Sequence, residues 1–133
     1  MKPPPVDGVL ETVLYCRGSQ LDEMRSFYSE TLGLRAVFTK HPIAFRVGPG
    51  VLLIFDADTS SIQDDPPPHG STGPSHACLV VGREPYEEWK SHLERAGVEI
   101  KKEIEWPGGR RSVYFDDPAG NLLEIADGDF WPR

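Results

Sequence analysis

Glu124 is the strongest candidate for a functional residue, because its carboxylate lies among apolar residues in the sequence. It stands within the apolar run 122–126, and the turn-forming segment Asp-Asp-Pro-Ala-Gly-Asn separates that run from a second apolar run, 113–115. The pattern predicts a β-hairpin whose second strand carries a carboxylate. A buried charge is costly unless it is compensated, so we expect either an arginine partner, Arg110 or Arg111, or a bound metal ion.

The same hairpin carries a family resemblance. The segment Tyr-Phe-Asp-Asp-Pro-Ala-Gly-Asn-Leu-Leu-Glu-Ile, residues 114–125, resembles the closing hairpin of the vicinal-oxygen-chelate superfamily. That superfamily includes glyoxalase I, extradiol dioxygenases, fosfomycin-resistance thiol transferases and bleomycin-binding proteins. Phe27-Tyr28 followed by Leu32-Gly33-Leu34 is similar to its first helix and the exit from it. The resemblance covers about residues 10–126 and singles out no one reaction.

Periodicity predicts the same order of elements in both halves of the chain. The first half reads as a strand, a helix and three strands, at 9–16, 21–32, 35–39, 43–47 and 51–55. The second half has the same predicted order, a strand, a helix and three strands, at 76–81, 84–96, 98–104, 112–115 and 122–126. We therefore expect one α+β domain, 1–133, of two βαβββ modules at 9–56 and 75–127, a linker at 57–74 and a tail at 128–133.

Residue offsets support the duplication. Gly33 and Gly97, which end the two predicted helices, lie 64 residues apart, and Phe45 and Phe115 lie 70 apart. A longer loop at 106–111 accounts for the growth. The resemblance implies that each module forms a curved mixed sheet and that the two sheets close around a metal-bearing cavity.

The repeat joins isolated residues into one candidate site. Glu11 lies near the start of the first strand of one module and His76 at the start of the first strand of the other, 65 residues apart, while Ile54 and Glu124 stand 70 apart in the last strands. The resemblance implies metal ligation by Glu11, His76 and Glu124, with Ile54 as an apolar blank. One imidazole and two carboxylates suit Mn²⁺, Fe²⁺, Ni²⁺ or Zn²⁺. Taken singly, each ligand could be an ordinary strand residue.

The ligand set departs from two family patterns. Glyoxalase I has a glutamate where this chain has Ile54, and it uses four ligands. Dioxygenases and fosfomycin-type transferases use three ligands, but they usually have histidine at the position of Glu11. His76 and Glu124 match the usual ligands of the family.

Weaker candidates surround this set. His69 could act as a general base at the cavity mouth or be an exposed loop histidine. Arg110 and Arg111 could clamp a substrate carboxylate or phosphate, or form a solvated hairpin tip. We expect either Tyr114 or Phe115 to line the cavity, because they alternate onto opposite faces of a strand.

Composition excludes several classes of partner. The formal net charge of −7 and a pI near 5.0 oppose binding to nucleic acid or to anionic membranes. The sequence has no membrane-span candidate or signal peptide, which predicts a soluble, cytoplasmic protein. Cys16 and Cys78 form no Cys-x-x-Cys pair and are expected in the core, although Cys78 shares strand parity with His76.

Two functions follow as hypotheses. The first is a metal-dependent enzyme, a lyase or isomerase, a dioxygenase or a thiol transferase, in which a small substrate chelates the metal through adjacent oxygens and Glu124 serves as base. The second is a metal-free protein that binds an antibiotic or metabolite, like the bleomycin-sequestering members. A scaffold that retains only the fold is a third interpretation. The resemblance also implies a homodimer.

Overall fold

The computed structural model describes residues 2–133 and contains two four-stranded sheets. The first sheet has the order β1-β4-β3-β2, and the second has the order β5-β8-β7-β6. The strands are β1 (Glu11–Cys16), β2 (Arg35–Phe38), β3 (Ile43–Val47), β4 (Gly50–Asp56), β5 (His76–Val80), β6 (Lys102–Glu105), β7 (Arg111–Asp116) and β8 (Leu122–Ala126). The helices are α1 (Leu21–Ser26), α2 (Ala57–Ser60) and α3 (Arg83–Arg95).

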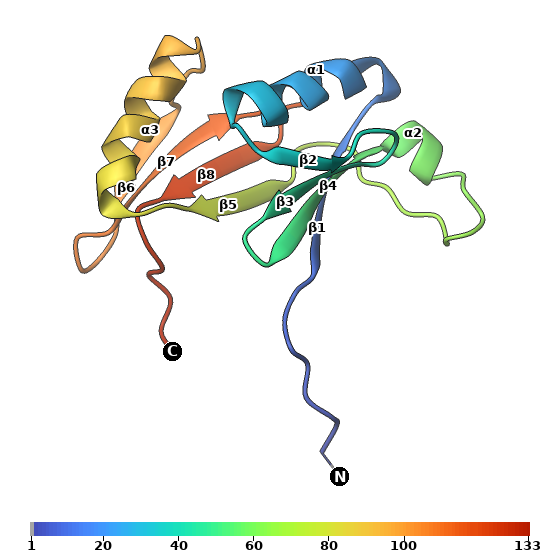
Figure 1. Cartoon of the computed structure of the whole chain (residues 1–133), viewed down its shortest axis with the longest axis horizontal. Coiled ribbons are helices and arrows are strands. Elements are labelled where there is room, and N and C mark those ends of the chain that lie inside the picture. Colours follow the sequence, from blue (N-terminus) through green and yellow to red (C-terminus); the bar gives the residue numbers. More distant parts are fainter. Residues whose placement is uncertain (1) are drawn as a thin grey trace.

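The two sheets have the same topology. In each, the first strand of the module pairs in parallel with the last, and the remaining pairs are antiparallel. This arrangement confirms the predicted α+β fold of two βαβββ modules. Figure 1 shows α1 and α3 on one side of the sheets, while the chain termini leave from the other side. We call the side away from α1 and α3 the open face of each sheet.

Alternation along the strands separates the core from the open face. Leu14, Ile54, Phe115, Leu123 and Ile125 point toward the helices and are at most 1 % exposed. Between the helices and the sheets they form one continuous hydrophobic cluster that spans both modules. The intervening residues of the same strands therefore point to the open face.

A buried carboxylate ties the two modules together. Asp117, in the β7–β8 turn, accepts hydrogen bonds from the Tyr28 hydroxyl at 2.7 Å and from Asn121 Nδ2 at 2.8 Å. The backbone N–H groups of Ala119 and Asn121 also donate to it. Asn121 Nδ2 reaches the Tyr15 carbonyl oxygen of β1 as well. Burial raises the pKa of Tyr28, and Asp117 adds to that rise, so its hydroxyl stays a donor.

Three local features differ from the sequence-based prediction. The helix expected at 21–32 is an α-helix only as far as Ser26 and continues as a π turn, Phe27–Thr31. β6 begins at Lys102 rather than at 98, because the Val98 N–H still caps α3 through the Leu93 carbonyl. The linker contains the short helix α2, which Asp56 caps by accepting a hydrogen bond from Asp58 N at 2.9 Å.

Within residues 2–133, no helix combines the length and the apolar character that crossing a membrane requires.

Candidate metal-binding site

His76 and Glu124 meet on the open face of the second sheet. The parallel register of β5 and β8 pairs His76 with Leu122 and Cys78 with Glu124, so His76 and Glu124 are diagonal neighbours. His76 Nε2 lies 3.2 Å from Glu124 Oε1. Glu124 is 5 % exposed, whereas the side chain of His76 is 47 % exposed. The pair therefore has a buried base and an accessible rim.

A backbone carbonyl orients the His76 ring. Nδ1 lies 2.8 Å from the carbonyl oxygen of Leu122, and because a carbonyl can only accept, this contact assigns a proton to Nδ1. In the neutral ring, Nε2 then directs a lone pair at Glu124 Oε1, which is also an acceptor. Such a contact is favourable only when a proton or a bound cation lies between Nε2 and Oε1. Metal-bound histidines commonly donate their other N–H to a carbonyl in this way.

The second oxygen of Glu124 has no partner. Oε2 is buried and, among residues 2–133, forms no hydrogen bond of standard geometry, although the Cys78 thiol and the Tyr114 hydroxyl lie close enough to the Glu124 carboxylate for it to raise their pKa values. A buried carboxylate oxygen without a donor costs free energy, and native proteins seldom leave one unexplained. Oε2 and the Nε2 lone pair together suit a divalent cation, so the chemistry of this pair fits the metal that the sequence resemblance implies.

Tyr114 and Cys78 complete the surroundings of the pair. Tyr114 lies opposite Glu124 in β7 and stacks against the His76 ring, with centroids 6.1 Å apart and 21° between the planes. Desolvation raises the pKa of the Tyr114 hydroxyl, and Glu124 contributes to the rise. Desolvation and Glu124 also raise the pKa of Cys78 to about 12. Cys78 is thus a neutral thiol at pH 7 and lies on the open face, not in the core as expected, whereas Cys16 is buried.

Glu11 lies away from this pair within one chain. It opens β1 at the edge of the first sheet and is exposed, on the same face of that strand as Val13 and Tyr15. In the part of the chain that the structure describes, no three His, Cys, Asp or Glu side chains are grouped closely enough to hold a metal. One chain therefore brings together two of the three predicted ligands.

The residue of the first module that is equivalent to Glu124 is Leu53, not Ile54 as the sequence predicted. Phe45 faces Leu52 across the first hairpin, and Phe115 faces Leu123 across the second, so the segment between the facing residues is one residue longer in the second hairpin. The strand registers therefore superimpose Leu53 on Glu124. Ile54 is 0 % exposed in the core, because a shift of one residue moves a side chain to the opposite face of the sheet. The fourth position is apolar, as expected.

His69 lies on the first sheet. Its Nδ1 is 2.6 Å from the Tyr15 hydroxyl, and its ring packs edge-on against Phe55 with centroids 4.6 Å apart. Among residues 2–133, no hydrogen bond or ring contact joins His69 to the His76–Glu124 pair.

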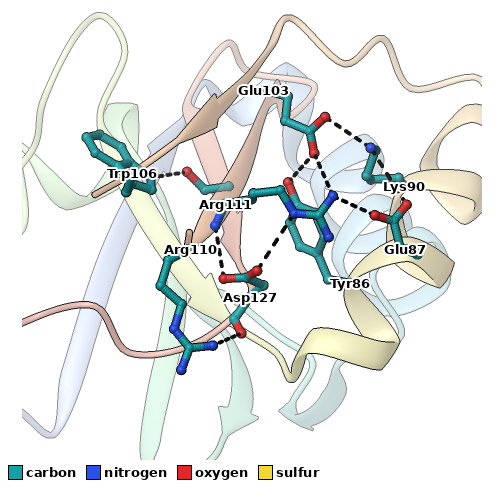
Figure 2. A network of polar contacts seen from close by, with 9 residues as sticks. Tyr86, Glu87, Lys90, Glu103, Trp106, Arg110, Arg111 and Asp127 are labelled. Atoms are coloured by element: carbon teal, nitrogen blue, oxygen red, sulfur yellow. Dashed lines mark hydrogen bonds and ion pairs between the residues drawn. The ribbon is translucent and has the colours of Figure 1, made fainter. Parts of the chain in front are cut away.

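Two of the predicted substrate contacts point away from the site. Figure 2 shows Arg111 on the helix side of the second sheet, where its guanidinium lies 4.6 Å from the Tyr86 ring centroid and 2.7 Å from a Glu87 oxygen. Phe115 is 0 % exposed within the core. Strand alternation places Tyr114 on the open face, and Arg111 and Phe115 on the helix side of the sheet. The predicted assignment of Arg111 and Phe115 to the substrate site is therefore corrected.

Arg110 is the last residue of the 106–110 loop, and Ser112 is the second residue of β7. Arg110 Nη1 donates to the Asp127 carbonyl oxygen at 3.3 Å, as Figure 2 shows. Ser112 is fully buried and accepts a hydrogen bond from Trp106 Nε1 at 2.8 Å. Sequence reasoning did not single out Ser112, although its shared parity with Tyr114 was the available signal.

Comparison with known proteins places this geometry in context. The model of the Glyoxalase/Bleomycin resistance protein/Dioxygenase superfamily matches residues 12–125. A lactoylglutathione lyase structure from Agrobacterium tumefaciens is 34 % identical, with a TM-score of 0.88 over 96 % of this chain and 98 % of that one. The virulence protein STM3117 from Salmonella typhimurium is 26 % identical, with a TM-score of 0.68 and coverages of 92 % and 98 %. The fosfomycin resistance protein FosX from Mesorhizobium loti, 16 % identical, has the same fold, with a TM-score of 0.67 and coverages of 95 % and 96 %.

Proposed function

Since the chain belongs to the glyoxalase/bleomycin resistance protein/dioxygenase superfamily, we propose that it is a metal-dependent enzyme acting on a small substrate that has adjacent oxygen atoms. The observation that carries this proposal is the buried, unpartnered Oε2 of Glu124 beside the Nε2 of His76. A divalent ion bound there would supply charge stabilisation for an oxyanion of the substrate. The 34 % identity to a structure named lactoylglutathione lyase favours a proton-transfer reaction of the lyase or isomerase type.

The residues of this chain have distinct parts in such a reaction. His76 is held in one tautomer by the Leu122 carbonyl, so Nε2 remains available as a donor of its lone pair. Glu124 would hold the ion together with His76 Nε2 through one carboxylate oxygen, and its other oxygen would accept a proton from substrate carbon. The neutral Tyr114 hydroxyl can donate a hydrogen bond beside them.

A second copy of the chain would supply Glu11. Within one chain Glu11 and the His76–Glu124 pair lie on different sheets, and both are on strand faces that the helices leave uncovered. The first sheet of a partner subunit facing the second sheet of this one would add the third ligand. It would also bring the Tyr15–His69 pair, since Tyr15 and Glu11 share a face of β1. In this arrangement His69 is the second candidate for proton transfer.

Metal analysis of untagged protein, purified without chelator, tests the proposal. We expect about one divalent ion per chain, lost in His76→Ala and Glu124→Gln and retained in the matched control Glu94→Gln, an exposed glutamate of α3. Failure of the parent protein to bind Mn²⁺, Fe²⁺, Ni²⁺ or Zn²⁺ would overturn the metal-dependent function.

Mixed dimers test the origin of the third ligand. Dimers of a Glu11→Gln chain with a His76→Ala chain would have one site with both defects and one intact site. We expect the mixed dimer to recover metal binding that neither variant shows alone. Were Glu11 and His76 of the same chain to share a metal, every site in the mixture would be defective.

A second candidate is a metal-free binding protein for a metabolite or antibiotic. It is favoured by the apolar Leu53 at the fourth position and by the grouping of only two candidate ligands within residues 2–133. In that case the proton on Nε2 would compensate Glu124, and ligand affinity would be unchanged by chelator. The same metal titration separates the two functions.

A further inference from the structure

Two groups of aromatic rings lie near each other on the open face of the second sheet. Tyr114 stacks on His76, and at the other end of the series Trp106 and Phe130 have centroids 5.5 Å apart, followed by Phe130 and Trp131 at 5.7 Å. The hydrogen bond from Trp106 Nε1 to Ser112 joins the two groups. Because Ser112 and Tyr114 alternate onto the same face of β7, the series begins beside the His76–Glu124 pair.

The tail that contributes Phe130 and Trp131 is held in place. Arg110 donates to the Asp127 carbonyl and packs against Gly128 so closely that a Cβ atom there would lie 2.8 Å from Nη1. Asp129 accepts hydrogen bonds from the backbone of Trp131 at 3.0 Å and from Arg133 at 2.9 Å. Trp131 nevertheless remains 74 % exposed. A large aromatic side chain that is anchored and still exposed is a surface for a ligand rather than for the core.

A positive charge lies beside this series. Lys102 faces Tyr114 directly across the β6–β7 pair, and Ile104 faces Ser112. Directly opposed residues on one face have Cβ atoms roughly 5 Å apart, so the Lys102 ammonium can reach over the Tyr114 ring. Among residues 2–133, no carboxylate forms an ion pair with Lys102. This unpaired cation offers a local positive charge to an anionic ligand, against the net charge of −7 of the whole chain.

We propose that Tyr114, Trp106, Phe130 and Trp131 form an aromatic track that binds the ring of an aromatic carboxylate, with Lys102 holding its negative charge. This inference rests on the proposed function and names its substrate class, because the track leads to the His76–Glu124 pair. An elongated aromatic acid would place its ring on Trp106 and Phe130 and its reacting end at that pair.

Indole N–H signals in ¹H–¹⁵N spectra of the full chain test the track directly. Phenylacetate, added in the presence of EDTA, is expected to shift the Trp106 and Trp131 signals in a saturable manner. Trp89, which lies on α3 against His92, should not move and serves as the internal control. Cyclohexylacetate should bind about threefold more weakly, because it lacks the π face, and acetate should leave all three signals unchanged.

Two variants separate the ring contact from the charge contact. Phe130→Ala should weaken phenylacetate at least about fivefold by removing the central ring of the track. Lys102→Met should weaken phenylacetate by a similar factor while leaving phenylacetamide unaffected, and Lys40→Met, an exposed lysine in the β2–β3 turn, is the control of equal charge.

Two outcomes would overturn the track. One is the absence of a saturable shift at Trp106 and Trp131. The other is an equal shift of those signals by acetate, which would mean that no ring is bound. Repeating the titration with Zn²⁺ in place of EDTA keeps the two proposals apart. Phenylacetate binding without metal uptake would support the track and reject the metal-dependent enzyme. Metal uptake without phenylacetate binding would support the metal-dependent enzyme and reject the track.

Discussion

Two carboxylates of the β7–β8 hairpin, seven residues apart, have opposite surroundings. Asp117 and Glu124 are nearly equally buried, at 4 % and 5 % exposure. Asp117 accepts four hydrogen bonds, two from side chains and two from the backbone. Glu124 meets the His76 ring at one oxygen, and within residues 2–133 its other oxygen forms no hydrogen bond of standard geometry. Folding satisfies the first carboxylate completely and leaves the second dependent on a proton or a ligand.

The difference shows how a buried charge can be assigned to stability or to function. A carboxylate that is fully hydrogen-bonded contributes to the folded state, and removing it leaves its donors unsatisfied. A carboxylate with an orphan oxygen costs stability, so its retention calls for a role outside folding. The predictions below test this contrast between Asp117 and Glu124.

Replacing Asp117 should have the largest effect on stability. Asp117→Ala strands the buried Tyr28 hydroxyl and the Asn121 amide, so the free energy of unfolding should fall by about 3–4 kcal/mol. Urea unfolding measures this change. Asp116→Ala, the exposed neighbour paired with Lys101, should cost less than about 1 kcal/mol. Equal losses in the two variants would contradict the role of Asp117. Tyr28→Phe, which removes one donor, provides a milder variant that remains folded.

Introducing a carboxylate at Leu53 should have an intermediate effect. Leu53→Glu places a charge at the position equivalent to Glu124 but without a histidine partner, which should cost about 1–3 kcal/mol of unfolding free energy. Ile54→Glu should cost clearly more, because that side chain points into the core. Thermal unfolding of both variants checks the register, and a reversed order would restore Ile54 as the equivalent of Glu124.

Neutralising Glu124 should hardly affect the metal-free protein. Glu124→Gln removes a charge with an orphan oxygen, so the free energy of unfolding should stay level or rise by up to about 1 kcal/mol, even as metal uptake is lost. Urea unfolding in EDTA, compared with the parent protein, measures this. A destabilisation as large as that of Asp117→Ala would show that both carboxylates are structural.

Replacing Asp58, an exposed carboxylate, should have the smallest effect on stability. The hydrogen bond from Arg17 lowers the pKa of Asp58 below its usual value. A lowered pKa in the folded state stabilises the protein above the unfolded pKa, and this contribution disappears as pH falls through the lowered value. Asp58→Asn should therefore be slightly less stable than the parent at pH 7, and the gap should close in acid. Unfolding curves at a series of pH values would show a constant gap if the Arg17 contact did not matter.

Much of the candidate site was predictable because the chain repeats itself. Strand alternation and the offset between the modules indicated that His76 and Glu124 belong together, and the structure brings them within 3.2 Å. The same reasoning misplaced the blank position by one residue, since a single added turn residue changes the strand register. The same reasoning also placed Phe115 and Arg111 among the substrate contacts, because sequence spacing does not say which strand face the helices cover.

The sequence by itself determined the two modules, the hairpin that carries Glu124 and the residue types available for a metal. These follow from local periodicity and turn chemistry, which act over a few residues. Only the tertiary structure decided that Asp117 is satisfied while Glu124 keeps a free oxygen, and that Glu11 lies on the other sheet. Those outcomes depend on which side chains from distant strands and helices meet, and the spacing along one strand does not contain that information.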